Sequence, residues 1–437
     1  MTALRPNLLK LLAPLAAFAV TLAVILALNG SSDLALPDAG ARTSLEIAPG
    51  ASAAERIELL QRATREGKAD AGTYAALGQA YMQRARESDD PSFVPRAERS
   101  FDEALRREPR NLDAVLGAGT LAGLRHDFRG QLRRGREAQR LVPGLVSPLP
   151  EIADAQIELG RYGAAERTLQ RLLDIKPNLT SYSRVSYLRE LTGDLPGAVE
   201  AMRLAVAAGG GDAESVAYVR VLLGNLELQR GRIAAARLAY TAALRSQPGY
   251  PAGMVGLART DAAGGELGRA AARLRRAAAR LPSPATLILL ADVEHARGRA
   301  AVAAELLGVA RAREARHAAT ELLDAEAVLF EADHGDPRRA VTIGTRVWER
   351  APSIRSADAL GWAYVRAGDP AKGAAWAQRA LRTGSRDPLY NLHAAVALRR
   401  AGRGAAAERH LEVAMRGRAA LPPSAAGLLE ATAMKSR

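Results

Sequence analysis

Cysteine is absent from this 437-residue chain, and aromatic residues make up only 4% of it. Without cysteine, the chain has no disulfide, no thiolate metal site and no cysteine nucleophile. The scarcity of aromatic residues, beside abundant alanine, leucine, arginine and glycine, argues against a sheet protein rich in β-branched side chains. The composition instead suits a stack of helices with a core of alanine and leucine.

Sequence motifs of common enzymes are missing as well. The chain has no H-E-x-x-H, no G-x-x-x-x-G-K-[ST] and no G-x-S-x-G. Its six histidines stand at no ligand spacing. The short runs at 334–336 and 209–212 resemble a metal fragment and a phosphate loop, but turn chemistry already explains their glycine and aspartate. We therefore predict a protein that is not an enzyme, with no catalytic residue, no cofactor and no metal.

Residues 151–177 show the organisation of the rest of the chain. They contain two short amphipathic helical patterns, joined at Gly160 and closed by Pro177. Pro177, Pro143 and Pro109 follow one another at intervals of 34 residues. A unit of two helices repeated at this period cannot bury its apolar face alone, so neighbouring units must stack.

This period and its residues resemble the tetratricopeptide-repeat (TPR) superfamily. The residues of the first full repeat that carry the resemblance are Tyr74, Leu77, Gly78, Tyr81, Ala97, Phe101, Ala104 and Pro109. The pattern continues, with drift, over about 71–420, and its order resembles large uncharacterised bacterial membrane-anchored TPR proteins. The resemblance implies an all-α fold, a right-handed superhelical solenoid of about ten TPR-like helix pairs, preceded by one N-terminal transmembrane helix. It implies no activity.

Local signals set the boundaries of the array. Ser52 followed by Glu55 predicts a capped leading helix that ends near Arg65. We place the solenoid at 52–421, with an insertion near 84–95 that should form an elongated helix end and a loop. Residues 29–51 are rich in Gly, Ser, Pro and Asp and predict a flexible linker, and 422–437 predict a frayed C-terminal tail.

Residues 11–28 contain no charge, and Arg5 and Lys10 precede them without an acidic residue. Eighteen apolar residues are just enough to span a bilayer. The positive flank predicts a single-pass signal-anchor over 1–28 in the cell membrane, with the array outside the cytoplasm. Two alternatives remain open: a cleaved signal peptide that would make the protein secreted, and a buried core helix.

The net charge of +14 raises the question of anionic partners. Arg269, Arg273, Arg276 and Arg280 share one stripe of a predicted helix, and six arginines fall within 125–140. These arginines could bind phosphate or another polyanion, or they could form a solvated outer face. Because no aromatic residues are interleaved with them, we favour the solvated face and expect no nucleic-acid partner.

The first helices of TPR-like repeats line a concave groove that usually holds a peptide or a partner helix. The register places seven candidate partner-binding residues on that face: Asn225, Arg259, Asp292, His295, Trp362, Arg366 and Arg399. Trp362 and Arg366 are one turn apart and are typical interface anchors. Trp362 could equally be a core residue.

The predicted function is a non-enzymatic, membrane-anchored scaffold that binds other proteins in this groove. Two alternatives remain open. One is a subunit of an envelope polysaccharide-export or secretion assembly, and the other is a regulatory accessory domain of a partner enzyme.

Overall fold

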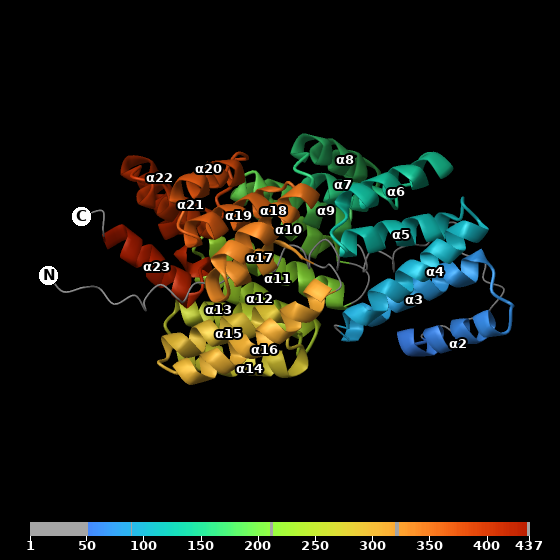
Figure 1. Ribbon diagram of the computed structural model, residues 1–437, viewed down its shortest axis with the longest axis horizontal. Coiled ribbons are helices and arrows are strands. Elements are labelled where there is room, and N and C mark those ends of the chain that lie inside the picture. The colour runs from blue at the N-terminus through green and yellow to red at the C-terminus, as the bar shows by residue number, and fades with distance from the viewer. Residues whose placement is uncertain (1–50, 89, 210–212, 320–322, 435–437) are drawn as a thin grey trace. The chain divides into compact units, whose positions relative to one another are not determined.

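The structure is a computed structural model that describes residues 51–88, 90–209, 213–319 and 323–434. Within these ranges every regular element is an α-helix or a short 3₁₀-helix, and no strand occurs (Figure 1). The predicted all-α fold is therefore confirmed. The described residues form two compact units, here called the N-terminal unit (51–176) and the C-terminal unit (177–315 with 323–434).

The helices up to residue 176 are α2 (Ala53–Arg65), α3 (Ala71–Ser88), η2 (Pro91–Phe93), α4 (Val94–Arg107), α5 (Leu112–Leu124), α6 (Phe128–Leu141), α7 (Leu149–Glu158) and α8 (Tyr162–Ile175). Those that follow are α9 (Leu179–Leu191), α10 (Leu195–Ala208), α11 (Ala213–Gln229), α12 (Ile233–Ser246), α13 (Pro251–Ala263), α14 (Leu267–Arg280), α15 (Pro284–Ala296) and α16 (Ala300–Ala319). The last are α17 (Ala325–His334), α18 (Pro337–Arg350), α19 (Ile354–Arg366), α20 (Pro370–Ala380), α21 (Pro388–Arg400), α22 (Gly404–Arg416), η3 (Arg418–Ala420) and α23 (Pro423–Met434).

Most helices contact their immediate neighbours along the chain, as a repeat array requires. In the described residues, α3 to α22 form ten consecutive pairs, with α2 before them and α23 after them. The predicted capping box is present at the start of α2, where Ser52 and Glu55 each bind the other's backbone N–H. The predicted turn at Gly160 is also present, with a φ of 66° that suits glycine.

An aromatic ring on a second helix fits between glycines on two first helices. A Cβ on Gly78 of α3 would lie 2.7 Å from Cε1 of Phe101 on α4, and a Cβ on Gly117 of α5 would lie 2.2 Å from the same atom. Side chains do not approach one another so closely, so any larger residue would push the ring out. Phe101 is 1% exposed, and it joins one repeat to the next.

The same arrangement recurs in the C-terminal unit. Tyr240 of α12 lies between Gly224 of α11 and Gly256 of α13, where added Cβ atoms would come within 2.4 and 2.3 Å of its ring. The glycines of the repeat pattern are thus required at these positions for close approach of neighbouring helices.

The insertion near 84–95 forms a long helix end and a short connection. Helix α3 continues to Ser88, η2 follows, and α4 begins at Val94. The ring of Phe93 stacks on Tyr81 of α3 with centroids 6.2 Å apart. This stacking holds the connection against its own repeat.

The C-terminal residues differ from the frayed tail that the sequence predicts for 422–437. Residues Pro423–Met434 form α23, and Ala425, Leu429 and Thr432 are buried along one side of it. These residues stand at helical spacing, so an amphipathic face was present in the sequence. Only three residues make up this face, and Leu429 is its one large apolar side chain, so its pattern in the sequence is weak.

The end of the C-terminal unit meets its beginning. The hydroxyl of Thr383, between α20 and α21, donates to the carbonyl oxygen of Leu191 at the end of α9, at 2.6 Å. A Cβ on Gly417 would lie 2.9 Å from the carbonyl oxygen of Gln229 at the end of α11. The last repeats of this unit therefore return to its first ones.

A membrane-spanning helix is not found in the described residues. No helix among them is both long and apolar enough to cross a bilayer. The predicted anchor at 1–28 and nearly all of the predicted linker at 29–51 lie outside the described ranges.

Gly117→Ala tests whether the aromatic ring joins the repeats. We expect the free energy of unfolding of the N-terminal unit to fall by about 1–3 kcal/mol, because the new methyl group overlaps the Phe101 ring. Urea denaturation measures this change. Adding Phe101→Leu should recover part of the loss, because the smaller side chain clears the methyl group.

Gly163→Ala on α8 is the control for this substitution. The nearest atom to its added Cβ lies 3.9 Å away, which is ordinary contact. We expect no destabilisation there, because alanine is the better helix former. Equal losses at positions 117 and 163 would contradict the proposed role of the ring.

Candidate functional site

All seven predicted partner-binding residues lie on first helices of the C-terminal unit. Asn225 is on α11, Arg259 on α13, Asp292 and His295 on α15, Trp362 and Arg366 on α19, and Arg399 on α21. The structure places residues 417–434, here called the C-terminal segment, against part of this face. The segment comprises η3 and α23, and it contacts α11, α13, α15, α21 and α22.

Arg259 holds the start of the C-terminal segment. Its Nη2 donates to the carbonyl oxygen of Ala420 at 3.0 Å, and its Nη1 donates to Oδ1 of Asn225 at 2.9 Å. The hydroxyl of Tyr240 donates to the same Asn225 oxygen at 2.7 Å. Burial raises the pKa of Tyr240, so this hydroxyl stays protonated and remains a donor. Asn225 and Tyr240 therefore orient the Arg259 guanidinium toward the segment.

Asp292 and Arg399 bind the two ends of α23. Oδ2 of Asp292 accepts the backbone N–H of Ser424, in the first turn, at 3.2 Å. Nη1 of Arg399 donates to the carbonyl oxygen of Thr432, in the last turn. Burial raises the pKa of Asp292 to about 7, although its hydrogen bond with Ser424 favours the charged form. The first N–H groups and last C=O groups of a helix have no partners within it, and the helix dipole favours a cation at the last end. Both contacts therefore recognise a helix through its backbone.

Apolar side chains of the C-terminal segment complete its binding. Ala419 and Ala420 are buried in one cluster with Val221 and Leu228 of α11 and with Leu257 of α13. Leu421, Ala425 and Leu429 belong to a second cluster with residues of α17, α19 and α21. Leu429 is fully buried, with 0% exposure.

Trp362 does not lie on an open surface, contrary to the expectation that it faces the groove. It is 1% exposed, stacks on His393 with centroids 4.2 Å apart, and donates its indole N–H to Asp333 at 2.9 Å. Arg366 is also mostly enclosed, with its Nε 3.3 Å from Oδ1 of Asp333. The alternative that Trp362 is a core residue describes the structure better. Partner binding by these two residues stays a prediction.

His295 is half-buried at the C-terminal end of α15. It lies three residues after Asp292 and so on the same side of the helix.

Several buried ionisable residues beside Trp362 were not identified from the sequence. Asp333 is one, and burial raises its pKa to about 7, although Arg366 and the Trp362 N–H both favour the charged form. Asp358 accepts from Nδ1 of His393 at 2.9 Å. Polar residues on first helices that are otherwise Ala- and Leu-rich could have signalled this cluster. Among the described residues, no group of three or more His, Asp or Glu is arranged to hold a metal ion.

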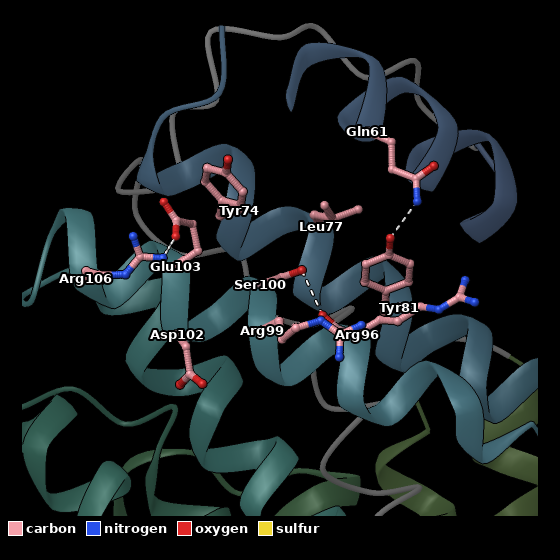
Figure 2. Close-up of a pocket in the computed structure, with 10 residues that line it drawn as sticks. All are labelled: Gln61, Tyr74, Leu77, Tyr81, Arg96, Arg99, Ser100, Asp102, Glu103 and Arg106. Carbon is pink, nitrogen blue, oxygen red and sulfur yellow. Dashed lines mark hydrogen bonds and ion pairs between the residues drawn. The ribbon is translucent and has the colours of Figure 1, made fainter. Parts of the chain in front are cut away.

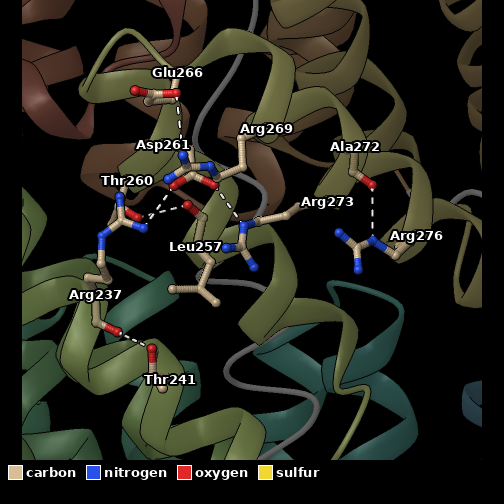
Figure 3. Close-up of polar contacts among 10 residues, drawn as sticks. All are labelled: Arg237, Thr241, Leu257, Thr260, Asp261, Glu266, Arg269, Ala272, Arg273 and Arg276. Atoms are coloured by element: carbon tan, nitrogen blue, oxygen red, sulfur yellow. Dashed lines mark hydrogen bonds and ion pairs between the residues drawn. The ribbon is translucent and has the colours of Figure 1, made fainter.

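The arginine stripe of α14 is only partly a solvated face. Asp261, with 0% exposure on α13, is bound by Arg237 of α12 at 2.8 Å and by Arg273 of α14 at 2.7 Å (Figure 3). Arg276 is exposed, and its Nε lies 3.4 Å from the carbonyl oxygen of Ala272 on its own helix. Arg273 therefore stabilises a buried carboxylate between repeats, whereas Arg276 faces solvent.

Similar carboxylates recur one repeat before and one repeat after Asp261. Glu227 on α11, 2% exposed, binds Arg203 and Arg230 at 3.0 and 3.4 Å. Glu294 on α15, 0% exposed, binds Arg297 at 2.9 Å and also Arg275. Each acid lies in the last turn of a first helix and receives an arginine from the preceding second helix. Much of the positive charge of this region is therefore used in ion pairs.

The second basic run, at 125–140, also contains ion pairs. Arg125 pairs with Glu98, and Arg134 lies 2.9 Å from Glu137. Neither set of arginines forms a uniform patch of unpaired positive charge.

The N-terminal unit contains a separate open groove of about 640 Å³ between α2, α3 and α4 (Figure 2). Its apolar side is formed by Tyr74, Leu77 and Tyr81 of α3. Arginines and two acids of α4 form the other side, and Gln61 of α2 donates to the Tyr81 hydroxyl at 2.6 Å. The signal for this groove was visible in the sequence, since Tyr74, Leu77 and Tyr81 are residues of the repeat pattern.

Arg273→Ala and Arg276→Ala test the different roles of two arginines on one helix. We expect Arg273→Ala to lower the free energy of unfolding by about 1–3 kcal/mol, because the buried Asp261 loses one of its two cations. Arg276→Ala should change it by less than about 0.5 kcal/mol, as for other exposed positions. Urea denaturation of both variants measures the difference, and equal effects would show that Arg273 has no special role.

Comparison with known proteins supports the repeat assignment. Residues 151–213 and 221–260 match the family described as Tetratricopeptide repeat. No curated protein matches the chain. A chain of the APC/C hetero-tetramer Cut9–Hcn1 is 16% identical, with a TM-score of 0.40, over 87% of this chain and 67% of that one.

A human IFIT1 dimer with PPP-AAAA is 15% identical, with a TM-score of 0.48, over 76% of this chain and 78% of that one. The human IFIT1 dimer with m7Gppp-AAAA is 14% identical, with a TM-score of 0.47 and the same coverage.

The family match coincides with α7 to α13, where the helix pairs are regular. In these stretches the chain therefore matches the tetratricopeptide-repeat family.

Proposed function

We propose that this chain is a non-enzymatic scaffold that binds short helical segments of other proteins on the first helices of its C-terminal unit. The observation that carries the proposal is the pair of contacts at the ends of α23. Asp292 accepts an N–H from the first turn, and Arg399 donates to a carbonyl oxygen of the last turn. These contacts bind main-chain groups at the two ends of a helix.

The structural setting agrees with this function. TPR-type arrays are interaction scaffolds, and a helix laid in a groove is a common mode of peptide recognition. Arg259 adds a donor for the main chain that leads into the helix. The buried ionisable groups around Asp333 and Trp362 bind one another on neighbouring helices of the same unit.

We further propose that the scaffold is anchored in the cell membrane through residues 1–28, with the array extracytoplasmic. The uncharged run at 11–28 and the preceding Arg5 and Lys10 motivate this proposal. Protease added to intact spheroplasts should digest the array, and the N-terminal residue should be retained. Protection of the array would contradict the orientation, and a mature N-terminus near residue 30 would indicate a cleaved signal peptide.

Site-specific photo-crosslinking in cells that express the full chain tests the binding face. With a photoreactive amino acid in place of His295, which lies beside Asp292, we expect crosslinks to a partner segment, identified by mass spectrometry. In a chain that also carries Leu421→Asp and Leu429→Asp, so that the C-terminal segment no longer occupies the face, adding Arg399→Ala should reduce them by about 2- to 10-fold, the effect of losing one helix-end contact of about 0.4–1.4 kcal/mol.

The matched position is Leu238 on α12, which is 68% exposed on a second helix. We expect no specific partner crosslinks from that position. Crosslinks from 238 alone would move the binding surface to the second helices and contradict the proposal.

A further inference from the structure

We propose that the C-terminal segment, residues 417–434, is a built-in ligand of this face, and that a partner helix binds by replacing it. This inference rests on the proposed function and adds the regulation and ligand chemistry of the same site. It would make the free protein a closed form whose groove is already filled.

The segment is bound by residues that are distant in sequence. Asp292 binds Ser424 across 132 residues, and Arg259 binds Ala420 across 161. In an ordinary repeat array each unit touches its neighbours only. In this unit Thr383 also reaches the end of α9, so the segment lies where the last repeats meet the first ones. A terminal helix that needed only a cap on the last repeat would rest on α21 and α22, whereas α23 also reaches α15 and η3 reaches α11 and α13.

The segment is also separable from the repeats. It follows the last complete pair, and Gly417 is its link to α22. Helix α23 has only twelve residues, and isolated helices of that length are marginal in water. Only one of its sides is buried, through Ala425, Leu429 and Thr432. We expect opening of the segment to expose its partners in the two apolar clusters and to leave the ten helix pairs folded.

The contacts define the chemistry of the replacing partner. Its helix must begin near Asp292 and end near Arg399, because each residue needs an unpaired backbone group at a helix terminus. The distance between the bound residues, Ser424 and Thr432, corresponds to about two turns. Small residues must face the groove, as Ala425 does, with one leucine-sized side chain in the place of Leu429. A short amphipathic helix rich in alanine and leucine meets these requirements, whereas a long helix cannot present both termini.

Two other features of the described chain do not identify a ligand. The groove at Tyr74, Leu77 and Tyr81 in the N-terminal unit is open, but nothing in the structure indicates what would cover it. The arginine stripe of α14 is partly used in the ion pair with Asp261.

The test is binding of a fluorescent peptide with the sequence of residues 417–434 to the full-length protein. In the variant with Leu421→Asp and Leu429→Asp, burying the two carboxylates is unfavourable and the segment should leave the groove. We expect this variant to bind the peptide at least tenfold more tightly than the unaltered protein, whose own segment competes. Circular dichroism and cooperative unfolding show whether the repeats remain folded.

Leu238→Asp is the matched control, since this leucine is 68% exposed. It should bind the peptide no better than the unaltered protein. A folded double variant that binds no peptide would overturn the proposal. So would equal binding by the double variant and the unaltered protein.

If the double variant does not fold, Ser424→Pro provides a milder release. Proline is tolerated in the first turn of a helix; at position 424 it removes the N–H that Asp292 accepts and the hydroxyl of Ser424, and it disfavours the helical conformation of Pro423. Hydrogen exchange in the unaltered protein gives a second measurement. Amides of α23 should exchange at least tenfold faster than those of α21, and exchange at the same rate would mean that the segment opens only with the whole unit.

The outcomes also separate this inference from the proposed function. Peptide binding without partner crosslinks from position 295 would support the segment as a built-in ligand and contradict binding of a partner helix. Crosslinks without peptide binding would support partner binding and contradict the built-in ligand. A dimer in which α23 is exchanged between copies would make a second copy the occupant and overturn the assignment to a partner protein.

Discussion

The close approach of helices around a single aromatic ring is the constraint on which this structure depends. Phe101 enters the space that glycine leaves open at positions 78 and 117, and Tyr240 does the same between Gly224 and Gly256. The ring is shared by two repeats, so it fixes the distance between neighbouring pairs. Only 4% of the chain is aromatic, and two of these rings lie where two repeats join, whereas alanine and leucine fill most other core positions.

Close packing brings polar groups of the first helices out of contact with water, and each then needs a partner. Asp261 has two arginines from the flanking second helices, and Glu227 and Glu294 are held similarly. Replacing one partner of such a pair leaves a buried charge, which is why these arginines contribute to stability. The high net charge of the chain therefore overstates the positive charge available to an anionic ligand.

The contacts of the C-terminal segment also give polar groups of the first helices their partners. Arg259, Asp292 and Arg399 bind main-chain groups of this segment, and a helix terminus supplies groups that its own hydrogen bonds leave unpaired. Under the proposed function, a surface that binds backbone termini accepts different sequences, provided that their length and small side chains fit. This property connects the geometry of the face to a scaffold that binds other proteins.

The sequence by itself determined the helical class, the period, the capped start of α2 and the register that places Asn225, Arg259 and Asp292 on first helices. These features depend on residues within one or two repeats. The 34-residue spacing therefore indicates the period and the register from the sequence alone. Only the tertiary structure decided that Trp362 is enclosed by His393 and Asp333, and that α23 returns to α15. Those contacts join residues from 29 to 132 positions apart, and the return depends on the path of the intervening repeats, which no local pattern encodes.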